Sequence, residues 1–342
     1  MDGVQAEVAV ETGVADSGMD TAEGGRSLYV DPAEGSVLVE EDSELRRSDG
    51  ACVARYRDGV ARFVESDRYA GSFGYQWHAA RAARSAHPLL RRTHEETLAE
   101  RTGFGEYDFT GMRCLEIGCG MGDDTAYLLG FPFAEVCSFD LSRSVDRVAA
   151  RFEDDRLRLA QADVNAMPYP DDAFDVVFFH RVLQHTPHPA AALARAARKV
   201  KPGGLLFVHS YHRSTMNSQY AKYKYRWLTR RLPTRAVWRV LRLAGSPLHG
   251  ANAAIAGRFA GGREFVRRWS PLMLMDQTWP GTDRKTLVEL EVLASFDALT
   301  PRYDQPMWAC DFLDLIASMG FEVVRSQTEP WRPLTATAVR RG

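Results

Sequence analysis

The sequence predicts an α/β protein built around a doubly wound, mostly parallel sheet. Between residues 112 and 211, short apolar runs alternate with helical stretches. The runs are rich in Val, Ile, Leu and Phe, which is typical of strands that helices cover on both faces. The first run ends in a glycine-rich turn that leads into a helix. Together these observations favour a sheet in which each strand is followed by a crossover helix.

Three segments precede this core. Residues 1–26 are rich in Gly, Ala, Asp and Glu and lack periodicity, so we expect a disordered tail. Residues 27–66 contain short β-like pieces broken by turn sequences, which predicts a small β-rich module. Residues 67–110 begin with an aromatic segment and continue as one or two helices, which we interpret as an N-terminal helical cap.

The core is expected at 111–211. Its predicted strands are 112–118, 134–140, 157–163, 173–180 and 205–211, and the helices between them are 123–129, 144–152 and 190–200. Residues 212–275 are helical and strongly basic, and they interrupt the sheet, so we expect a lid insertion there. In 276–342 the alternation resumes with a helix at 309–320 and strands at 321–327 and 334–341, which we expect to complete the core.

Composition excludes several classes of protein. The 342 residues carry a formal net charge of −2, so nothing suggests binding to nucleic acid or to a membrane. No apolar run approaches the roughly 18 residues that cross a bilayer, and the acidic N-terminus does not resemble a signal peptide. We therefore expect a cytoplasmic protein. None of the five cysteines forms a Cys-x-x-Cys pair, so we expect buried, reduced thiols and no metal site.

The glycine turn indicates which ligand the core binds. Gly118, Gly120 and Gly122 carry no side chains, so backbone amides can approach a ligand closely. A dinucleotide site requires another glycine where Asp123 stands, and a P-loop requires a lysine after its last glycine. Asp123 and Asp124 would also repel a pyrophosphate. The pattern therefore disfavours cofactors that carry phosphates.

S-adenosylmethionine has no phosphate and fits this turn better. Its positive sulfur and its ammonium group favour a nearby acid such as Glu116. Asp140 ends the second strand about twenty residues after the glycines, where it can accept hydrogen bonds from a ribose diol. Asp163 lies at the end of the third strand and can contact adenine, with Val164 packing on the ring. Each acid also has a structural alternative, since Glu116 can accept backbone amides, Asp140 can cap a helix and Asp163 can be a turn residue.

Five motifs lie in order between residues 115 and 208. They are LEIGCGMG, the aspartate of SFDLS, QADVNAMPYPDDAFDVVF, RVLQHTPHP and RKVKPGGLLFV. In these motifs the chain resembles the class I S-adenosylmethionine-dependent methyltransferases, especially the bacterial branch that includes ubiquinone and menaquinone biosynthesis enzymes. The resemblance implies a Rossmann-like sheet of seven strands, S-adenosylmethionine as cofactor and S-adenosylhomocysteine as product. It also relates residues 27–66 to a zinc-ribbon-like module, here without the metal-binding cysteines.

The resemblance places 180–185 beside both cofactor and acceptor. His180 and His185 are therefore candidate bases or positioning residues, although His185 can instead pack under the following helix. Gln184 stands where family members often carry a histidine. Taken together, the candidate cofactor-binding residues are Glu116, Gly118, Cys119, Gly120, Gly122, Asp140, Leu141, Asp163, Val164 and His180.

Two further segments are candidates for acceptor contact. Tyr75 and Trp77 belong to an aromatic segment that helps close the pocket in the resembled family, or that plugs the core. Arg302 and Tyr303 lie in 296–306, which resembles the family segment before the last helix. The basic insertion can be a solvated face, a dimer surface or a lid that binds a carboxylate or phosphate.

We therefore expect a methyltransferase that acts on a nitrogen or oxygen of a small molecule in bacterial specialised metabolism. A homodimer is possible, and neither nucleic acid nor membrane is expected as a partner. Two other functions stay open: a protein that binds S-adenosylmethionine without transferring methyl groups, and an RNA or protein methyltransferase that uses the basic lid. Turnover of labelled cofactor tests the first of these, and the salt dependence of RNA affinity tests the second.

Overall fold

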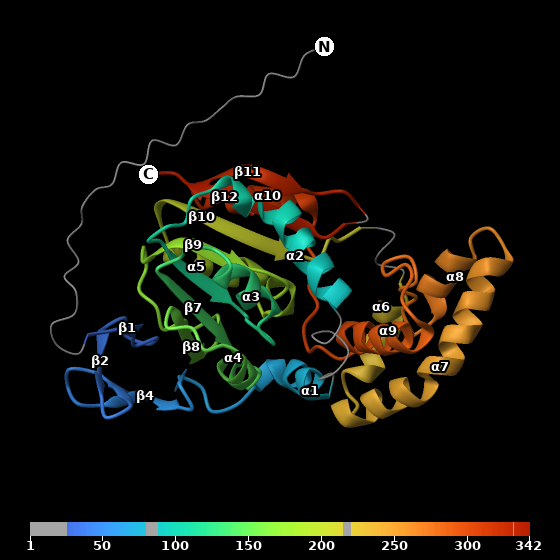
Figure 1. The fold of residues 1–342 in the computed structure, drawn as a ribbon, viewed down its shortest axis with the longest axis horizontal. Helices are drawn as coiled ribbons and strands as arrows, with labels where there is room; N and C mark the ends of the chain where they lie inside the picture. The colour runs from blue at the N-terminus through green and yellow to red at the C-terminus, as the bar shows by residue number, and fades with distance from the viewer. Residues whose placement is uncertain (1–25, 80–87, 215–219, 331) are drawn as a thin grey trace, which may run out of the picture.

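The computed structural model describes residues 26–79, 88–214, 220–330 and 332–342. These residues form a mixed sheet of 12 strands with helices on both faces and a helical insertion at one end (Figure 1). The predicted doubly wound α/β fold is therefore confirmed. The predicted disordered tail lies, apart from its last residue, outside the described residues.

Seven strands form the core, in the order β8-β7-β6-β9-β10-β12-β11. Their bounds are β6 (Arg113–Ile117), β7 (Glu135–Asp140), β8 (Leu157–Gln161), β9 (Phe174–Phe179), β10 (Val200–Ser210), β11 (Phe321–Gln327) and β12 (Leu334–Arg340). The first five of this order are parallel, and β12 runs antiparallel to both of its neighbours. The order reverses between β6 and β9, so a ligand crevice is expected at the carboxyl ends of these strands.

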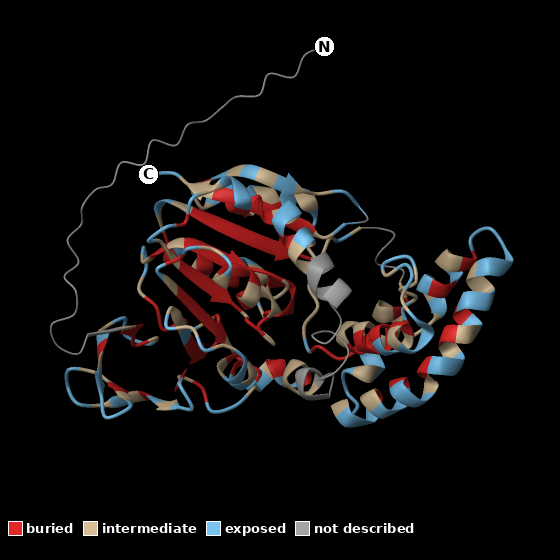
Figure 2. Ribbon diagram, in the orientation of Figure 1, coloured by how far each residue is buried: buried red, intermediate tan, exposed pale blue. Residues whose placement is uncertain are grey.

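Side chains of each core strand point alternately to two layers of helices. On one face, Cys114 and Phe207 pack with α2 (Pro88–Thr102) and α3 (Asp123–Leu129), while α4 (Val145–Arg151) covers β8. On the other face, Leu115 and Val208 pack with α5 (Pro189–Lys199) and α10 (Ala309–Ser318). Figure 2 shows the central strands buried along most of their length. Burial on both faces explains the continuous apolar runs in the sequence.

The N-terminal strands extend the core sheet. They are β1 (Arg26–Val30), β2 (Val37–Glu41), β3 (Glu44–Arg46), β4 (Cys52–Arg57) and β5 (Val60–Arg62), and they form an antiparallel meander. β5 then pairs in parallel with β8, with Val60 beside Leu159. The β-rich segment expected at 27–66 is therefore continuous with the core, and its likeness to a zinc ribbon stays a prediction.

The helical insertion lies between β10 and α10. It consists of α6 (Ala221–Thr229), α7 (Thr234–Arg258), α8 (Gly262–Trp269) and α9 (Arg284–Leu299). Its own apolar core joins Val237 of α7 to Phe296 of α9, and Tyr75 of α1 (Gly71–Ala79) packs on the same cluster. Because α9 packs in this cluster, the insertion extends past residue 275. We had expected the core to resume at residue 276. None of the described helices is both long enough and apolar enough to cross a membrane.

Candidate functional site

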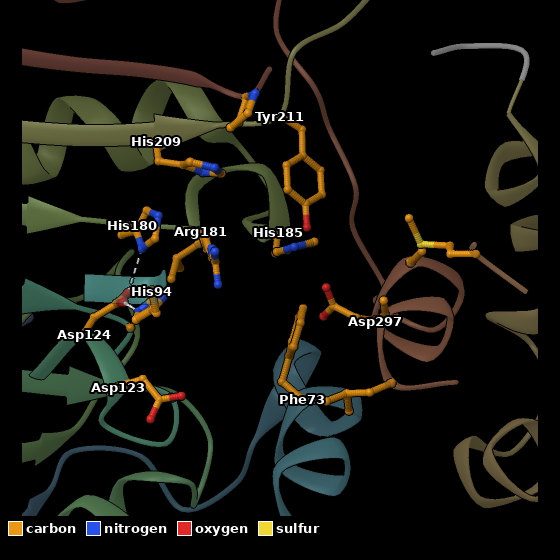
Figure 3. A pocket seen from close by; sticks show the side chains of 18 of the residues that line it. Phe73, His94, Asp123, Asp124, His180, Arg181, His185, His209, Tyr211 and Asp297 are labelled. Atoms are coloured by element: carbon orange, nitrogen blue, oxygen red, sulfur yellow. Dashed lines mark hydrogen bonds and ion pairs between the residues drawn. The ribbon is translucent and has the colours of Figure 1, made fainter. Parts of the chain in front are cut away.

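A cavity of about 1070 Å³ opens at the carboxyl ends of the core strands. Loops after β6, β7, β8, β9 and β10 form its floor, and residues of α1 and α2 line its sides. Residues 270–279 and α9 of the insertion form the opposite wall. Figure 3 shows polar side chains from several of these elements projecting into it. The cavity therefore lies where the reversal of strand order predicts a ligand site.

The glycine turn after β6 forms one part of the floor. Gly118, Cys119 and Gly120 line the cavity. The amides of Gly118 and Cys119 donate to the carbonyl oxygen of Phe139 at 2.8 and 3.1 Å, which holds the turn against β7. Gly118 has a φ of 83°, in the left-handed region where glycine is preferred.

The side chain of Val182 fills the space beside Gly118. A Cβ on Gly118 would lie 2.2 Å from Cγ2 of Val182. We expect Gly118→Ala to lower the free energy of unfolding by about 2–4 kcal/mol, through backbone strain and overpacking together, and to weaken cofactor binding. Urea unfolding and calorimetry measure the two effects.

Gly203→Ala is the matched control, because Gly203 has a similar φ of 77° but open space around it. Gly203→Ala should therefore lose only the stability that backbone strain costs. Adding Val182→Ala to Gly118→Ala should restore part of the lost stability. Equal losses in the two glycine variants would contradict a clash with Val182.

Asp140 ends β7 beside the glycine turn. Its Oδ2 accepts the amide of Gly120 at 3.0 Å, and its Oδ1 accepts the amide and the hydroxyl of Ser142, both at 2.7 Å. Burial raises the pKa of this carboxyl group. Because a carboxylate offers about four lone-pair sites, capacity remains for a ribose diol. Leu141 and Val164 line the same part of the cavity with apolar surface.

Two other predicted cofactor residues do not line the cavity. Gly122, with a φ of 82°, is the residue from which α3 begins. Asp163 accepts a hydrogen bond from the hydroxyl of Tyr69 at 2.9 Å and lies 3.2 Å from Nη1 of Arg68. In this structure Asp163 therefore joins the end of β8 to the segment that precedes α1.

Glu116 is also set apart from the cavity, between β6 and α3. Its Oε2 accepts hydrogen bonds from Thr125, at 2.7 Å, and from the hydroxyl of Ser138. Burial, and then the charge of Asp124, raise its pKa from 4.5 to about 8. These contacts support the structural alternative for Glu116.

This raised pKa makes stability depend on pH. The unfolded chain ionises the carboxyl group near 4.5, whereas the folded chain keeps the proton up to about 8. The folded state therefore binds more protons between these values, and the contribution of Glu116 to stability is lost as pH rises through them. Glu116→Gln should make this decline shallower in urea unfolding between about pH 5 and pH 8.

Glu153→Gln is the control for this prediction, because Glu153 is exposed. It should leave the pH dependence of the wild type unchanged. Parallel stability curves for the wild type and Glu116→Gln would contradict the prediction.

His180 directly follows β9 and is buried. Its Nδ1 lies 2.8 Å from Oδ2 of Asp124, and Nε2 of His94 lies 2.7 Å from Oδ1 of the same carboxylate. Burial opposes ionisation of Asp124, but the charges and hydrogen bonds of both histidines outweigh it and hold its pKa well below the ordinary value. Burial lowers the pKa of His180 to about 4. His180 is thus a neutral ring that anchors Asp124.

His185 lies in the turn after β9. Its Nδ1 is 3.0 Å from the carbonyl oxygen of Tyr303. A carbonyl oxygen only accepts, so Nδ1 carries the proton and Nε2 keeps its lone pair. Burial lowers the pKa of His185 and keeps the ring neutral near pH 7. The rings of Phe73 and Tyr211 lie 4.8 and 5.4 Å from it, and Figure 3 shows all three around the cavity with Asp297.

The residues predicted to contact the acceptor lie elsewhere. Tyr75 packs within the insertion, with its ring 6.5 Å from that of Trp238. Arg302 and Tyr303 line a separate depression of about 340 Å³. The side chain of Trp77 lies outside the described part of the structure. The structure therefore does not bring the described side chains of this group to the large cavity.

Sequence reasoning missed several side chains of the cavity wall. His209 and Tyr211 come from the end of β10 and its following loop, so the strand-end rule that pointed to Asp140 could have found them. His94 and Arg101 share one face of α2, and Asp297 belongs to α9. No local signal in the sequence says which face of these helices meets the sheet edge.

The fold and the site together define a class of protein. The turn at Gly118 and Gly120 lines the cavity with its backbone, the half-buried carboxylate of Asp140 lies at the end of the next strand, and apolar side chains lie beyond it. Acidic rather than basic side chains, Asp123 and Asp124, follow the turn. This donor set fits S-adenosylmethionine, with Asp140 for the ribose diol and Leu141 and Val164 for adenine.

Sequence comparison identifies the domain more closely. Residues 115–208 match the family model described as a methyltransferase domain. This match supports the resemblance to the class I S-adenosylmethionine-dependent methyltransferases that the sequence motifs suggested, with S-adenosylmethionine as the methyl donor.

Three curated relatives illustrate the range of similarity. Sterol 24-C-methyltransferase erg6 of Aspergillus fumigatus is 27% identical over 187 residues, which are 53% of this chain and 47% of that protein. 27-O-demethylrifamycin SV methyltransferase of Amycolatopsis mediterranei is 36% identical over 101 residues, 28% and 37% of the two chains. Ubiquinone/menaquinone biosynthesis C-methyltransferase UbiE of Stutzerimonas stutzeri is 34% identical over 113 residues, 31% and 44%. In each case this chain spans less than half the length of the relative.

Proposed function

We propose that this protein transfers the methyl group of S-adenosylmethionine to an oxygen or nitrogen atom of a small molecule. The observation that carries the proposal is the state of His185. It is a neutral, buried imidazole beside the cavity. Its Nδ1–H donates to the carbonyl oxygen of Tyr303, and Nε2 carries a lone pair. An O–H or N–H acceptor loses a proton when it is methylated, and such a histidine can take that proton.

The shape of the cavity supports a small acceptor with an apolar body. Its volume of about 1070 Å³ exceeds what one drug-sized ligand usually needs, so cofactor and acceptor can share it. The insertion supplies a wall of apolar side chains: Leu272, Met273, Leu274, Met275, Leu290 and Leu293. Methionine side chains adapt to ligands of different shape, which suits an acceptor site.

Different residues of this chain would bind the cofactor, align the acceptor and remove its proton. S-adenosylmethionine supplies a methyl group on a positively charged sulfur, which leaves as a neutral thioether. Gly118, Gly120 and Asp140 would hold the cofactor at the ends of β6 and β7. Phe73 and Tyr211 would hold the acceptor in line with the methyl group, because methyl transfer depends chiefly on this alignment. His185 would take the acceptor proton on Nε2.

The relatives bear on the acceptor atom and on the metabolic setting. Two are named as C-methyltransferases, which favours a carbon acceptor as the alternative. The rifamycin enzyme is named for a 27-O-demethyl substrate, which supports an oxygen acceptor and a role in bacterial specialised metabolism. The chain's richness in Ala and Arg also suits a GC-rich bacterial genome.

The deciding experiment uses S-adenosylmethionine labelled with ¹³C in its methyl group. The protein is incubated with panels of phenols, carboxylic acids, amines and electron-rich rings, and separately with RNA and with protein. The products are identified by NMR, in which O-, N- and C-methyl groups have separate shifts. Calorimetry with S-adenosylhomocysteine measures cofactor binding independently.

Label on oxygen or nitrogen is the expected result. Label on carbon would replace the proposed acceptor atom by the alternative. Cofactor binding without transfer to any acceptor would favour a non-methylating protein, and label in added RNA or protein would favour a macromolecular substrate. Absence of cofactor binding would overturn the proposed function.

A further inference from the structure

Most cations that line the cavity already have acidic partners. Arg151 pairs with Asp123 at 2.8 Å, Lys222 with Asp304 at 3.0 Å, Arg263 with Asp276 at 2.6 Å, Arg267 with Glu264 at 3.5 Å, and Arg332 with Glu100 at 3.1 Å. Arg101 and Arg181 line the same cavity. Within the ranges that the structure describes, no carboxylate pairs with either of these two side chains.

Arg181 is held in an unusual backbone conformation. It follows β9 with a φ of 59°, a left-handed value that costs free energy for a residue with a side chain. The buried side chain of Gln184 donates from Nε2 to the carbonyl oxygen of Arg181 at 2.8 Å, which secures the turn. Figure 3 shows the Arg181 side chain projecting into the cavity between His180 and His185.

Arg101 approaches the same place from α2. It lies in the last turn of the helix, seven residues after His94 and on the same face. Burial, and then the positive charge of Arg181, lower the pKa of Arg101 to about 10. Two guanidinium groups that repel each other in a partly enclosed site favour an anion between them, because it would offset both desolvation and repulsion.

A third polar group lies beside the two arginines without a partner. His209 is 2% exposed, and its Nδ1 makes no hydrogen bond to any described residue. Burial, and then the charges of His180, Arg181 and Arg101, lower the pKa of His209. Its ring lies 4.8 Å from that of His180 and points into the cavity in Figure 3. Nδ1 of His209 can therefore serve as a further donor to an anion.

Arg181 and His209 come from a different half of the sheet than most of the candidate cofactor residues. Gly118 and Val164 follow β6 and β8, and Asp140 ends β7. Arg181 follows β9 and His209 lies near the end of β10, on the other side of the switch point. This is also the side of His185 and Tyr211. Arg181 therefore faces the part of the cavity that the proposed function assigns to the acceptor, and Arg101 lies close enough for the two charges to interact.

We propose that Arg101 and Arg181, assisted by His209, bind an oxyanion of the methyl acceptor, a carboxylate or a phosphate. The inference rests on the proposed function and adds the chemical class of its substrate. It also moves the anion site from the basic insertion, where the sequence suggested it, to the core, since Lys222, Arg263 and Arg267 of the insertion have acidic partners.

The test measures binding of benzoate, phenyl phosphate and neutral benzamide to the protein saturated with S-adenosylhomocysteine, by ligand-detected NMR. The wild type should bind at least one of the anions and should bind benzamide more weakly. Arg181→Gln and Arg101→Gln should each weaken anion binding about tenfold or more, as expected for a lost charge-assisted contact. Both should leave the affinity for S-adenosylhomocysteine within about twofold of the wild type.

Arg263→Gln is the matched control, because it removes a positive charge from the same cavity where Asp276 already pairs with it. It should keep the affinity for the anion. Equal binding of benzamide and benzoate, or anion binding that neither arginine variant weakens, would overturn the proposal. If Arg181→Gln instead weakens S-adenosylhomocysteine but not 5′-methylthioadenosine, which has no carboxylate, the pair serves the cofactor and the proposal is wrong. Failure of the wild type to bind S-adenosylhomocysteine would contradict the proposed function itself, so the two failures are distinguishable.

Discussion

Asp140→Ala is expected to weaken S-adenosylmethionine binding by about 1–3 kcal/mol, a loss of roughly 5- to 150-fold in affinity. The carboxylate would lose its charge-assisted hydrogen bonds to the ribose diol. The variant would also free the amide of Gly120, which Asp140 accepts at 3.0 Å, and so loosen the turn that receives the methionine part of the cofactor. Calorimetric titration with S-adenosylhomocysteine measures the change.

Two further variants separate these contributions. Ser142→Ala removes one donor to Asp140 but leaves the carboxylate and its bond to Gly120, so its effect should be smaller. Asp155→Ala removes an exposed carboxylate far from the turn in sequence and should leave affinity unchanged. An affinity for Asp140→Ala equal to that of the wild type would show that Asp140 only supports the loop.

Sequence reasoning could find the cofactor side of the cavity because of one topological rule. Parallel strands end at the same edge of a sheet, so Gly118, Asp140 and Val164 come together although they lie far apart in the chain. The rule gives the edge but not the direction of each side chain. Glu116 precedes the turn by two residues, yet alternation along β6 turns it toward α3 and away from the cavity.

The residues on the acceptor side of the cavity could not be predicted, because they are brought together by long-range contacts that no local sequence pattern encodes. The spacing of His94 and Arg101 predicts one helix face but not its docking partner, which is Asp124 for His94. The sequence leaves Tyr75 open between closing the pocket and plugging the core. The structure shows it packed in the insertion, on Trp238, a contact across more than a hundred and fifty residues of sequence. Similarly, the N-terminal strands join the core sheet because β5 pairs with β8. Turn sequences indicate where a strand ends, but they do not predict a pairing partner so far along the chain.

His185→Ala is expected to lower kcat for methyl transfer to an O–H or N–H acceptor by about 10²–10⁴-fold, the usual worth of a positioned general base. Cofactor affinity should stay within about twofold of the wild type, because His185 lies on the acceptor side. The wild type should also show an acid limb in its pH–rate profile. Burial lowers the pKa of His185 below the ordinary 6.5, so this limb should lie below that value, and the rate should fall as acid protonates Nε2.

The pH profile separates a base from a packing residue. If His185 takes the proton, the acid limb should disappear in the residual activity of His185→Ala, whereas a packing role would lower the rate equally at every pH. His188→Ala is the matched control, because His188 is exposed three residues further along the same loop and should keep both the rate and the limb. An acid limb that persists unchanged in His185→Ala would assign the titration to another group and remove the observation on which the choice of an oxygen or nitrogen acceptor depends.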